Sequence, residues 1–198
     1  PGILGDAVKH YNEVSTTTQR QFAVQGALSL GSVVCGRYWT SEYDNYTSLY
    51  LVNLGVTGSG KEFGRTFLSR CLAEAGLDEL VGPGGYASAA GMMGAMIMKP
   101  RHVTTFDEFG KLLASTSGAS NTNLKDAQTL LISVFGTLGT EVRPQAYSLN
   151  GKTKEQVDLM RKTVVRRPAV TVLGLSTPET FFDAVSQDDV ANGFLNRL

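Results

Sequence analysis

The sequence has little that would assign it to a specialised class of protein. Its only two cysteines, Cys35 and Cys71, lie far apart, and neither belongs to a metal-ligand spacing. Both lie in apolar, helix-like surroundings, so we expect buried free thiols, which suit a reducing cytoplasm. No run of about 18 apolar residues is present, so we expect no membrane-spanning helix. The chain also has no excess of either charge, with 18 Lys and Arg against 18 Asp and Glu, so its overall charge does not indicate nucleic-acid or membrane binding.

The 198 residues, 42% of them hydrophobic, are enough for one core of ordinary size with at most a small appended subdomain. The first residues have no basic-then-apolar signal layout and no initiator methionine. The last residues stop within a helical pattern. We therefore expect a domain taken from a longer protein.

The clearest motif is a glycine-rich stretch that follows an apolar, strand-like run at residues 49–54. The stretch consists of Gly55, Val56, Thr57, Gly58, Ser59, Gly60, Lys61 and Glu62, and a helix-like pattern follows it. A strand, a Gly-x-x-x-x-Gly-Lys loop and a helix form the phosphate-binding loop of nucleotide hydrolases. Glycines let backbone N–H groups approach the phosphates, and Lys61 would reach the β- and γ-phosphates. The alternative is a glycine turn with an incidental lysine.

Glu62 departs from this motif, because a serine or threonine normally follows the lysine and holds magnesium. The sequence therefore predicts ATP binding more firmly than it predicts ATP hydrolysis.

Two adjacent acids close a β-prone run at residues 103–106. Hydrolysis needs one carboxylate near magnesium and another that orients the attacking water. Asp107 would support the metal and Glu108 would polarise the water. The alternative is a solvated helix start.

Polar residues follow another apolar run at residues 169–175. Ser176 and Thr177 could bond to the γ-phosphate or its attacking water, the role called sensor 1. The alternative is that they cap the next helix, which has Pro178 in its first turn. Arg197 is a candidate arginine finger, a residue that stabilises charge on the transferred phosphoryl group. The alternative is an exposed helix arginine, and Arg143 is a weaker candidate for the finger.

Positive charge is concentrated between residues 143 and 167, where seven basic side chains stand against two acidic ones. A basic hairpin there could follow a nucleic-acid backbone in a salt-sensitive and sequence-independent way. The alternative is a solvated charged loop.

Strand and helix patterns alternate along the chain, which predicts an α/β fold with a mainly parallel sheet. We expect residues 1–46 to form an N-terminal helical segment that packs on a core of residues 47–198. Its second helix should open with a capping box, Thr16-x-x-Gln19.

The expected helices cover 3–14, 16–35, 63–75, 88–98, 109–113 and 124–138, with a last one from 177, and further strands cover 142–149 and 164–175. Core filling is the expected role of Met92, Met93, Met96 and Met98.

The motifs occur in an order that resembles a known family. A Pro-Gly start with Gly5-Asp6 is followed by Gly-Ser-Gly-Lys-Glu at 58–62 and Asp-Glu-Phe-Gly at 107–110. The chain closes with Gly-Leu-Ser-Thr-Pro-Glu-Thr-Phe-Phe at 174–182 and Gly-Phe-Leu-Asn-Arg at 193–197. Nearly the whole chain resembles the ATPase domain of primase–helicase-like proteins encoded by phages and mobile elements, a family often catalogued only as a domain of unknown function.

The resemblance implies a RecA/AAA+-like P-loop NTPase fold, ATP and Mg²⁺ as cofactors, and a helicase role in phage or plasmid DNA replication. It also implies a homo-oligomeric ring in the full-length protein, located in the cytoplasm of a bacterial or phage-infected cell. A hairpin before sensor 1 lines the DNA channel in related ring helicases, which would place Lys152 and Lys154 near the strand. A nucleotide-gated scaffold with little hydrolysis is the alternative, and a small-molecule kinase is a third possibility that shares the loop.

Overall fold

The structure is a computed structural model, and it describes residues 2–17, 19–43, 45–116, 122–136, 140–144, 153–155, 163–185 and 193–198. Its helices are α1 (Ile3–Val14), α2 (Arg20–Cys35), α3 (Phe63–Glu74), α4 (Ala89–Met98), α5 (Phe109–Thr116), α6 (Thr122–Gly136) and α8 (Pro178–Ala184), with short 3₁₀ helices η1 (Asp78–Leu80) and η2 (Leu195–Arg197). Its strands are β1 (Tyr50–Leu54), β2 (Arg101–Phe106), β3 (Glu141–Val142), β4 (Val165–Arg166) and β5 (Ala169–Ser176).

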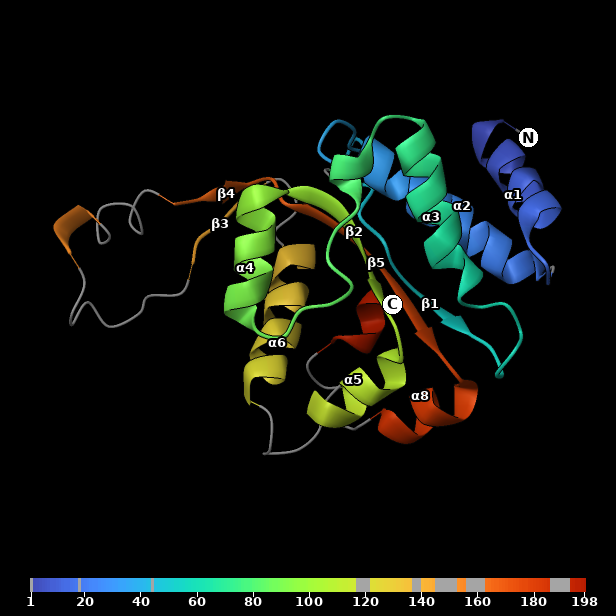
Figure 1. The fold of residues 1–198 in the computed structure, drawn as a ribbon. Coiled ribbons are helices and arrows are strands. Elements are labelled where there is room, and N and C mark those ends of the chain that lie inside the picture. Colours follow the sequence, from blue (N-terminus) through green and yellow to red (C-terminus); the bar gives the residue numbers. More distant parts are fainter. Residues whose placement is uncertain are drawn as a thin grey trace.

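The central sheet has three parallel strands in the order β1-β5-β2. Leu54 at the end of β1 is level with Ser176, and Phe106 at the end of β2 is level with Gly174. All eight residues of β5 are buried, as expected for a strand covered by helices on both faces. The carboxyl ends of the three strands therefore meet at one edge of the sheet (Figure 1).

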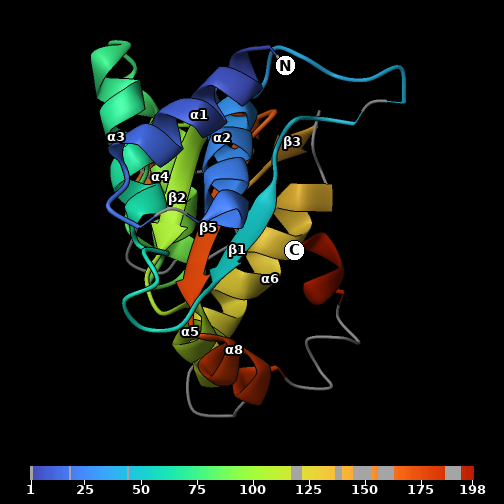
Figure 2. The ribbon, with the colours of Figure 1, turned by 90° about the vertical axis from the view of Figure 1, so that its right-hand side faces the viewer.

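Helices cover both faces of the sheet, with α1, α2 and α3 on one side and α4 and α6 on the other (Figures 1 and 2). Alternation along β5 divides the core between these layers. Leu173 and Leu175 pack in the cluster that contains Tyr11 and Phe67, whereas Val172 packs in the cluster that contains the α4 methionines. A mixed α/β structure with a parallel sheet flanked by helices is therefore confirmed.

The N-terminal helices contribute directly to the core. Phe22 and Val33 of α2 belong to the same buried cluster as Leu173 of β5. The Ser32 and Thr171 hydroxyls also share a buried hydrogen bond of 2.6 Å, which links α2 to the central strand.

The predicted capping box is wrong. Helix α2 begins at Arg20, and its N-cap residue Gln19 makes no side-chain cap hydrogen bond. The preceding hydroxyls bond locally instead, since the Thr17 N–H donates to Ser15 Oγ over 3.3 Å. Such local side-chain to backbone bonds offer the backbone an alternative to helix.

The strand predicted over 164–175 is divided into β4 and β5. Arg167 has a positive φ of 47° and Pro168 has no N–H to donate, so the chain turns between the two strands. Strand β4 pairs antiparallel with β3, which is shorter than the predicted strand over 142–149, and residues 145–149 lie outside the described residues.

Two burial predictions also need correction. Met92, Met93 and Met96 are buried as predicted, but Met98 is 82% exposed because it is the last residue of α4. Cys35 and Cys71 are free but only half-buried. Over the described part of the chain, no helix is long and apolar enough to cross a membrane.

Candidate functional site

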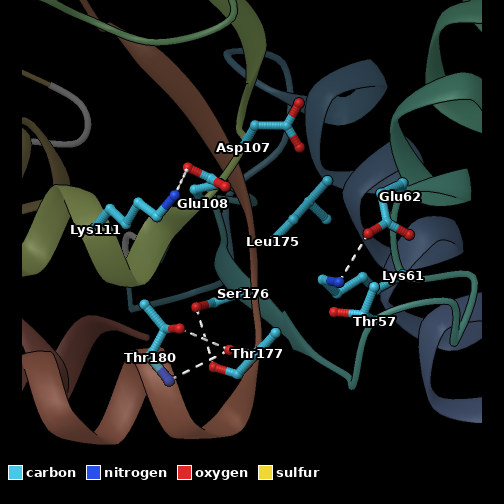
Figure 3. Close-up of a pocket in the computed structure, with 10 residues that line it drawn as sticks. All are labelled: Thr57, Lys61, Glu62, Asp107, Glu108, Lys111, Leu175, Ser176, Thr177 and Thr180. Atoms are coloured by element: carbon cyan, nitrogen blue, oxygen red, sulfur yellow. Dashed lines mark hydrogen bonds and ion pairs between the residues drawn. The ribbon is translucent and has the colours of Figure 1, made fainter.

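A cavity of about 500 Å³ lies at the carboxyl edge of the sheet (Figure 3). Open α/β sheets generally bind ligands in the crevice outside the carboxyl ends of their strands. The lining residues come from the glycine-rich loop, from the segment that follows β2, and from the end of β5 and the segment after it: Thr57, Lys61, Glu62, Asp107, Glu108, Lys111, Leu175, Ser176, Thr177 and Thr180.

The glycine-rich loop is fastened to the central strand. The Gly55 N–H donates to the Ser176 carbonyl over 3.0 Å, so the loop leaves β1 beside the end of β5. Gly58 and Gly60 have φ values of 78° and 83°, a left-handed conformation that only glycine adopts at little cost. At Gly60 a Cβ would also lie 3.0 Å from the Thr17 Cβ, so the connection between α1 and α2 leaves no room for a side chain.

Lys61 already has an anionic partner. Its Nζ lies 2.7 Å from Glu62 Oε1, and its side chain is only 10% exposed. The hydrogen bond from Lys61 lowers the pKa of Glu62, so this carboxylate stays ionised at neutral pH. The buried Asn53 amide donates to the Lys61 carbonyl over 3.4 Å and holds the backbone at the loop exit. Glu62 is therefore the anionic partner of Lys61 within the cavity.

The two predicted carboxylates face the same cavity, and each forms an ion pair. Asp107 Oδ2 lies 2.6 Å from Arg65 Nη1, and Glu108 Oε2 lies 2.6 Å from Lys111 Nζ. Glu108 has a φ of 53°, which is uncommon for a residue with a side chain. Such backbone outliers are concentrated at functional sites, where the surrounding structure offsets their cost.

The end of β5 supplies hydroxyl groups to the cavity. Thr177 caps α8 as one of the two predicted alternatives states, because its Oγ1 accepts from the Thr180 N–H over 3.3 Å. The buried Ser176 Oγ accepts from the Gly110 N–H over 3.3 Å and donates to the Thr177 carbonyl over 3.1 Å. Ser176 therefore connects β5 to the start of α5, beside Glu108.

Other predicted site residues lie elsewhere. Arg197 is not among the lining residues of this cavity: its Nη1 donates to the Gly193 carbonyl over 2.6 Å, and its guanidinium lies 6.0 Å from the Phe135 ring. Arg143 pairs with Glu141 over 2.5 Å. Lys154 is exposed, and Lys152 lies outside the described residues.

Several lining or supporting residues were not predicted from the sequence. Asn53 lies in the middle of an apolar strand, where a buried polar residue signals a positioning role. Lys111 follows Glu108 by three positions, a spacing at which helical neighbours form ion pairs. Only the folded structure shows that Arg65 reaches Asp107, because the two residues lie 42 positions apart.

The donor set suits a magnesium ion that is bound together with phosphates. Among the described residues, no group of three or more His, Cys, Asp and Glu side chains could hold a metal ion by itself. Magnesium in nucleotide sites is bound by one or two carboxylates together with substrate phosphates and waters. Glu62, Asp107 and Glu108 supply carboxylates around the cavity, beside the hydroxyls of Ser176 and Thr177.

Comparisons with known proteins add no relative. No protein-family model matches this sequence, and no curated protein is similar to it at a significant level.

Proposed function

We propose that this chain is the ATP-binding and ATP-hydrolysing motor domain of a phage- or plasmid-type replicative helicase or primase–helicase. One observation supports the proposal above all. A glycine loop with a buried lysine and an Asp-Glu pair come from strands on either side of β5 and face one cavity. A RecA/AAA+-like P-loop fold, as in the family that the sequence resembles, accounts for this arrangement.

The residues divide the work of hydrolysis between them. Backbone N–H groups of the loop and the start of α3 bind the phosphates, and Lys61 exchanges Glu62 for a phosphate oxygen. Asp107 supports Mg²⁺, which when bound would neutralise charge on the β- and γ-phosphates. Glu108 orients the attacking water. Ser176 lies at the end of β5, between the strand that leads to the glycine-rich loop and the strand that leads to the two carboxylates.

DNA and a ring of subunits are further parts of the proposal. They are supported by the family resemblance and by the basic segment from 143 to 167, of which residues 143–144, 153–155 and 163–167 are described. Arg197 does not line the cavity of its own chain, so a finger role would require that it act in a neighbouring subunit.

Two substitutions test nucleotide binding and turnover separately. Lys61→Ala should abolish ATP binding measured by calorimetry, because a phosphate then meets Glu62 without a cation. Glu108→Gln should retain binding and stop turnover, because the amide cannot accept a proton from water. Lys125→Ala, which removes an exposed lysine of α6, is the control and should change neither. If the unmodified protein has no affinity for ATP, the proposal is wrong.

The Lys61–Glu62 ion pair also supports a second candidate, a nucleotide-gated assembly or scaffold protein with little hydrolysis. Single-turnover hydrolysis with and without magnesium separates the two functions. A motor domain should show a magnesium-dependent rate that DNA increases. A scaffold should bind ATP and release almost no phosphate under either condition.

A further inference from the structure

A second polar cavity, of about 380 Å³, lies at the opposite, amino-terminal edge of the sheet. It is lined by four cations, Arg37, Lys99, Arg101 and Arg167, and by one carboxylate, Glu79. Arg101 is the first residue of β2, and Arg167 lies just before β5. The length of strands β2 and β5 therefore separates this cavity from the candidate nucleotide site.

The segment after α2 is held closely against the start of these strands. A Cβ built on Gly36 would lie 3.1 Å from the Ala169 Cβ and 3.3 Å from the Arg101 Cγ. Close approach therefore requires glycine at this position. The close approach at Gly36 brings Arg37, and the aromatic residues that follow Arg37, next to β2 and β5.

Three of the four cations are oriented by neutral groups. Arg101 donates to the Val34 carbonyl over 2.9 Å, and Lys99 donates to the Val81 carbonyl over 2.9 Å. Arg37 Nη2 donates to the Arg166 carbonyl over 3.1 Å, while its buried Nε has no partner within the described ranges. None of the four cations forms an ion pair with a described carboxylate. The charges of Arg37, Lys99 and Arg101 are therefore positioned by backbone carbonyls rather than by ion pairs.

Backbone strain is also concentrated at this edge. Arg37 has a φ of 69° and Arg167 has a φ of 47°; of the described non-glycine residues, only Glu108 shares this left-handed conformation. Left-handed backbone costs about 1–2 kcal/mol for a residue with a side chain, and glycine would avoid that cost. Two arginines with this backbone conformation in one cavity point to a role for their side chains.

Exposed aromatic rings adjoin the cations. Tyr38, Trp39 and Tyr43 are 72%, 67% and 78% exposed. The Arg101 guanidinium lies 4.7 Å from the centre of the Tyr38 ring, and a bridge between Thr40 and Tyr46 closes a small hairpin that carries Tyr43. Large aromatic rings rarely remain this exposed in a group without a binding role.

We propose that this edge binds single-stranded nucleic acid. Arg37, Lys99, Arg101 and Arg167 bind phosphodiesters, while Tyr38 and Trp39 stack on unpaired bases, the combination by which proteins bind single strands without reading sequence. The root of the basic β3–β4 segment adjoins the same edge, because Arg167 follows β4 directly. This surface would hold the nucleic-acid partner of the proposed motor, but the binding requires no nucleotide.

The test measures fluorescence anisotropy of a labelled oligothymidylate without nucleotide, with oligouridylate, a DNA duplex and inorganic polyphosphate as further probes. Trp39→Ala should weaken oligothymidylate binding by about tenfold, within the range measured for one base–aromatic stack. Phe182→Ala is the matched control, because Phe182 is a similarly exposed ring on α8 beyond the carboxyl edge, and it should bind as the unmodified protein does.

Arg167→Gly separates binding from folding. It should lower the dependence of log K on log salt concentration by about 0.7, the value for one phosphate contact with a single strand. Its thermal midpoint should stay the same or rise, because glycine accepts a positive φ. Arg70→Ala, at an exposed arginine of α3, should leave the salt dependence unchanged.

Two outcomes would overturn the proposal. One is binding that neither Trp39→Ala nor Arg167→Gly weakens. The other is binding in which duplex or polyphosphate matches the single strand and Trp39→Ala has no effect, which would indicate a simple anion site. Lys61→Ala should bind oligothymidylate normally, so failure of the nucleotide proposal and failure of this proposal give different results.

Discussion

Among single residues, Glu62 both lines the candidate site and pairs with its buried lysine. Its carboxylate is half exposed and lies 2.7 Å from the Lys61 ammonium, which is nearly buried. In the proposed nucleotide site, a phosphate would compete with this internal anion for Lys61. In the proposed nucleotide site Glu62 also stands where a serine or threonine normally holds magnesium, so we expect this one position to affect both ATP binding and hydrolysis.

Glu62→Thr should therefore strengthen ATP binding about fivefold, since an ion pair with a half-exposed partner contributes about 1 kcal/mol at most. It should also increase the magnesium-dependent rate of hydrolysis, because threonine supplies a hydroxyl for the metal. Calorimetry and phosphate release measure the two effects. Glu74→Thr, at an exposed acid near the other end of α3, is the control. A weaker affinity for ATP in Glu62→Thr would show that Glu62 assists binding.

Among the secondary-structure elements, the contact between α5 and the end of β5 shapes the site most closely. A Cβ on Gly110 would lie 2.7 Å from both the Ser176 Oγ and the Thr180 carbonyl oxygen. The absence of a side chain at Gly110 thus lets α5 approach both β5 and α8. This approach places Glu108 beside Ser176 in the cavity.

Gly110→Ala should lower the free energy of unfolding by about 1–3 kcal/mol, because backbone at Thr180 must move to admit the methyl group. Gly94→Ala is a matched control in the middle of α4, where a Cβ meets no atom within 4 Å. It should stabilise the protein by about 0.5–1 kcal/mol, since alanine favours helix more than glycine does. Urea unfolding checks both variants, and equal effects of the two would contradict the close contact of Gly110 with Ser176 and Thr180.

At the scale of the whole molecule, a buried polar network joins β2 to the segment before α4. His102 is fully buried, its Nδ1 lies 2.6 Å from the Lys99 carbonyl oxygen, and its Nε2 bonds to the Tyr86 hydroxyl. Tyr86 also bonds to the Thr104 hydroxyl over 2.7 Å. Burial lowers the pKa of His102 below its ordinary value of 6.5, so the folded protein holds this imidazole neutral.

Global stability should therefore decrease as the pH falls below about 6.5. In that range the unfolded chain binds a proton at His102 that the folded chain does not, which costs up to about 1.4 kcal/mol per pH unit. His102→Gln should lower stability at pH 8 and flatten this dependence. Urea unfolding between pH 5 and pH 8, within the range where histidine titrates, measures both slopes. Identical slopes in the two proteins would show that His102 does not control the dependence.

Local features of this protein follow from its sequence. Helix α1 covers the predicted residues, α8 has its predicted cap at Thr177, and the glycine-rich loop stands between β1 and α3. Each of these depends on neighbours within a few residues, through side-chain periodicity, capping and backbone freedom at glycine. The predicted capping box at Thr16 was wrong because an equally local bond at Ser15 competes with it.

The sequence by itself determined the parts of the candidate site: a phosphate-type loop ending in Lys61, an Asp-Glu pair after a strand, and a hydroxyl pair after another. Only the tertiary structure decided that β5 lies between β1 and β2, that Glu62 pairs with Lys61 in the cavity, and that Arg197 lies away from it. The physical reason is separation along the chain. Leu54 and Ser176 are far apart in the sequence and lie side by side only because β1 pairs with β5. Strand β5 takes the central place in the sheet because both of its faces are buried by helices.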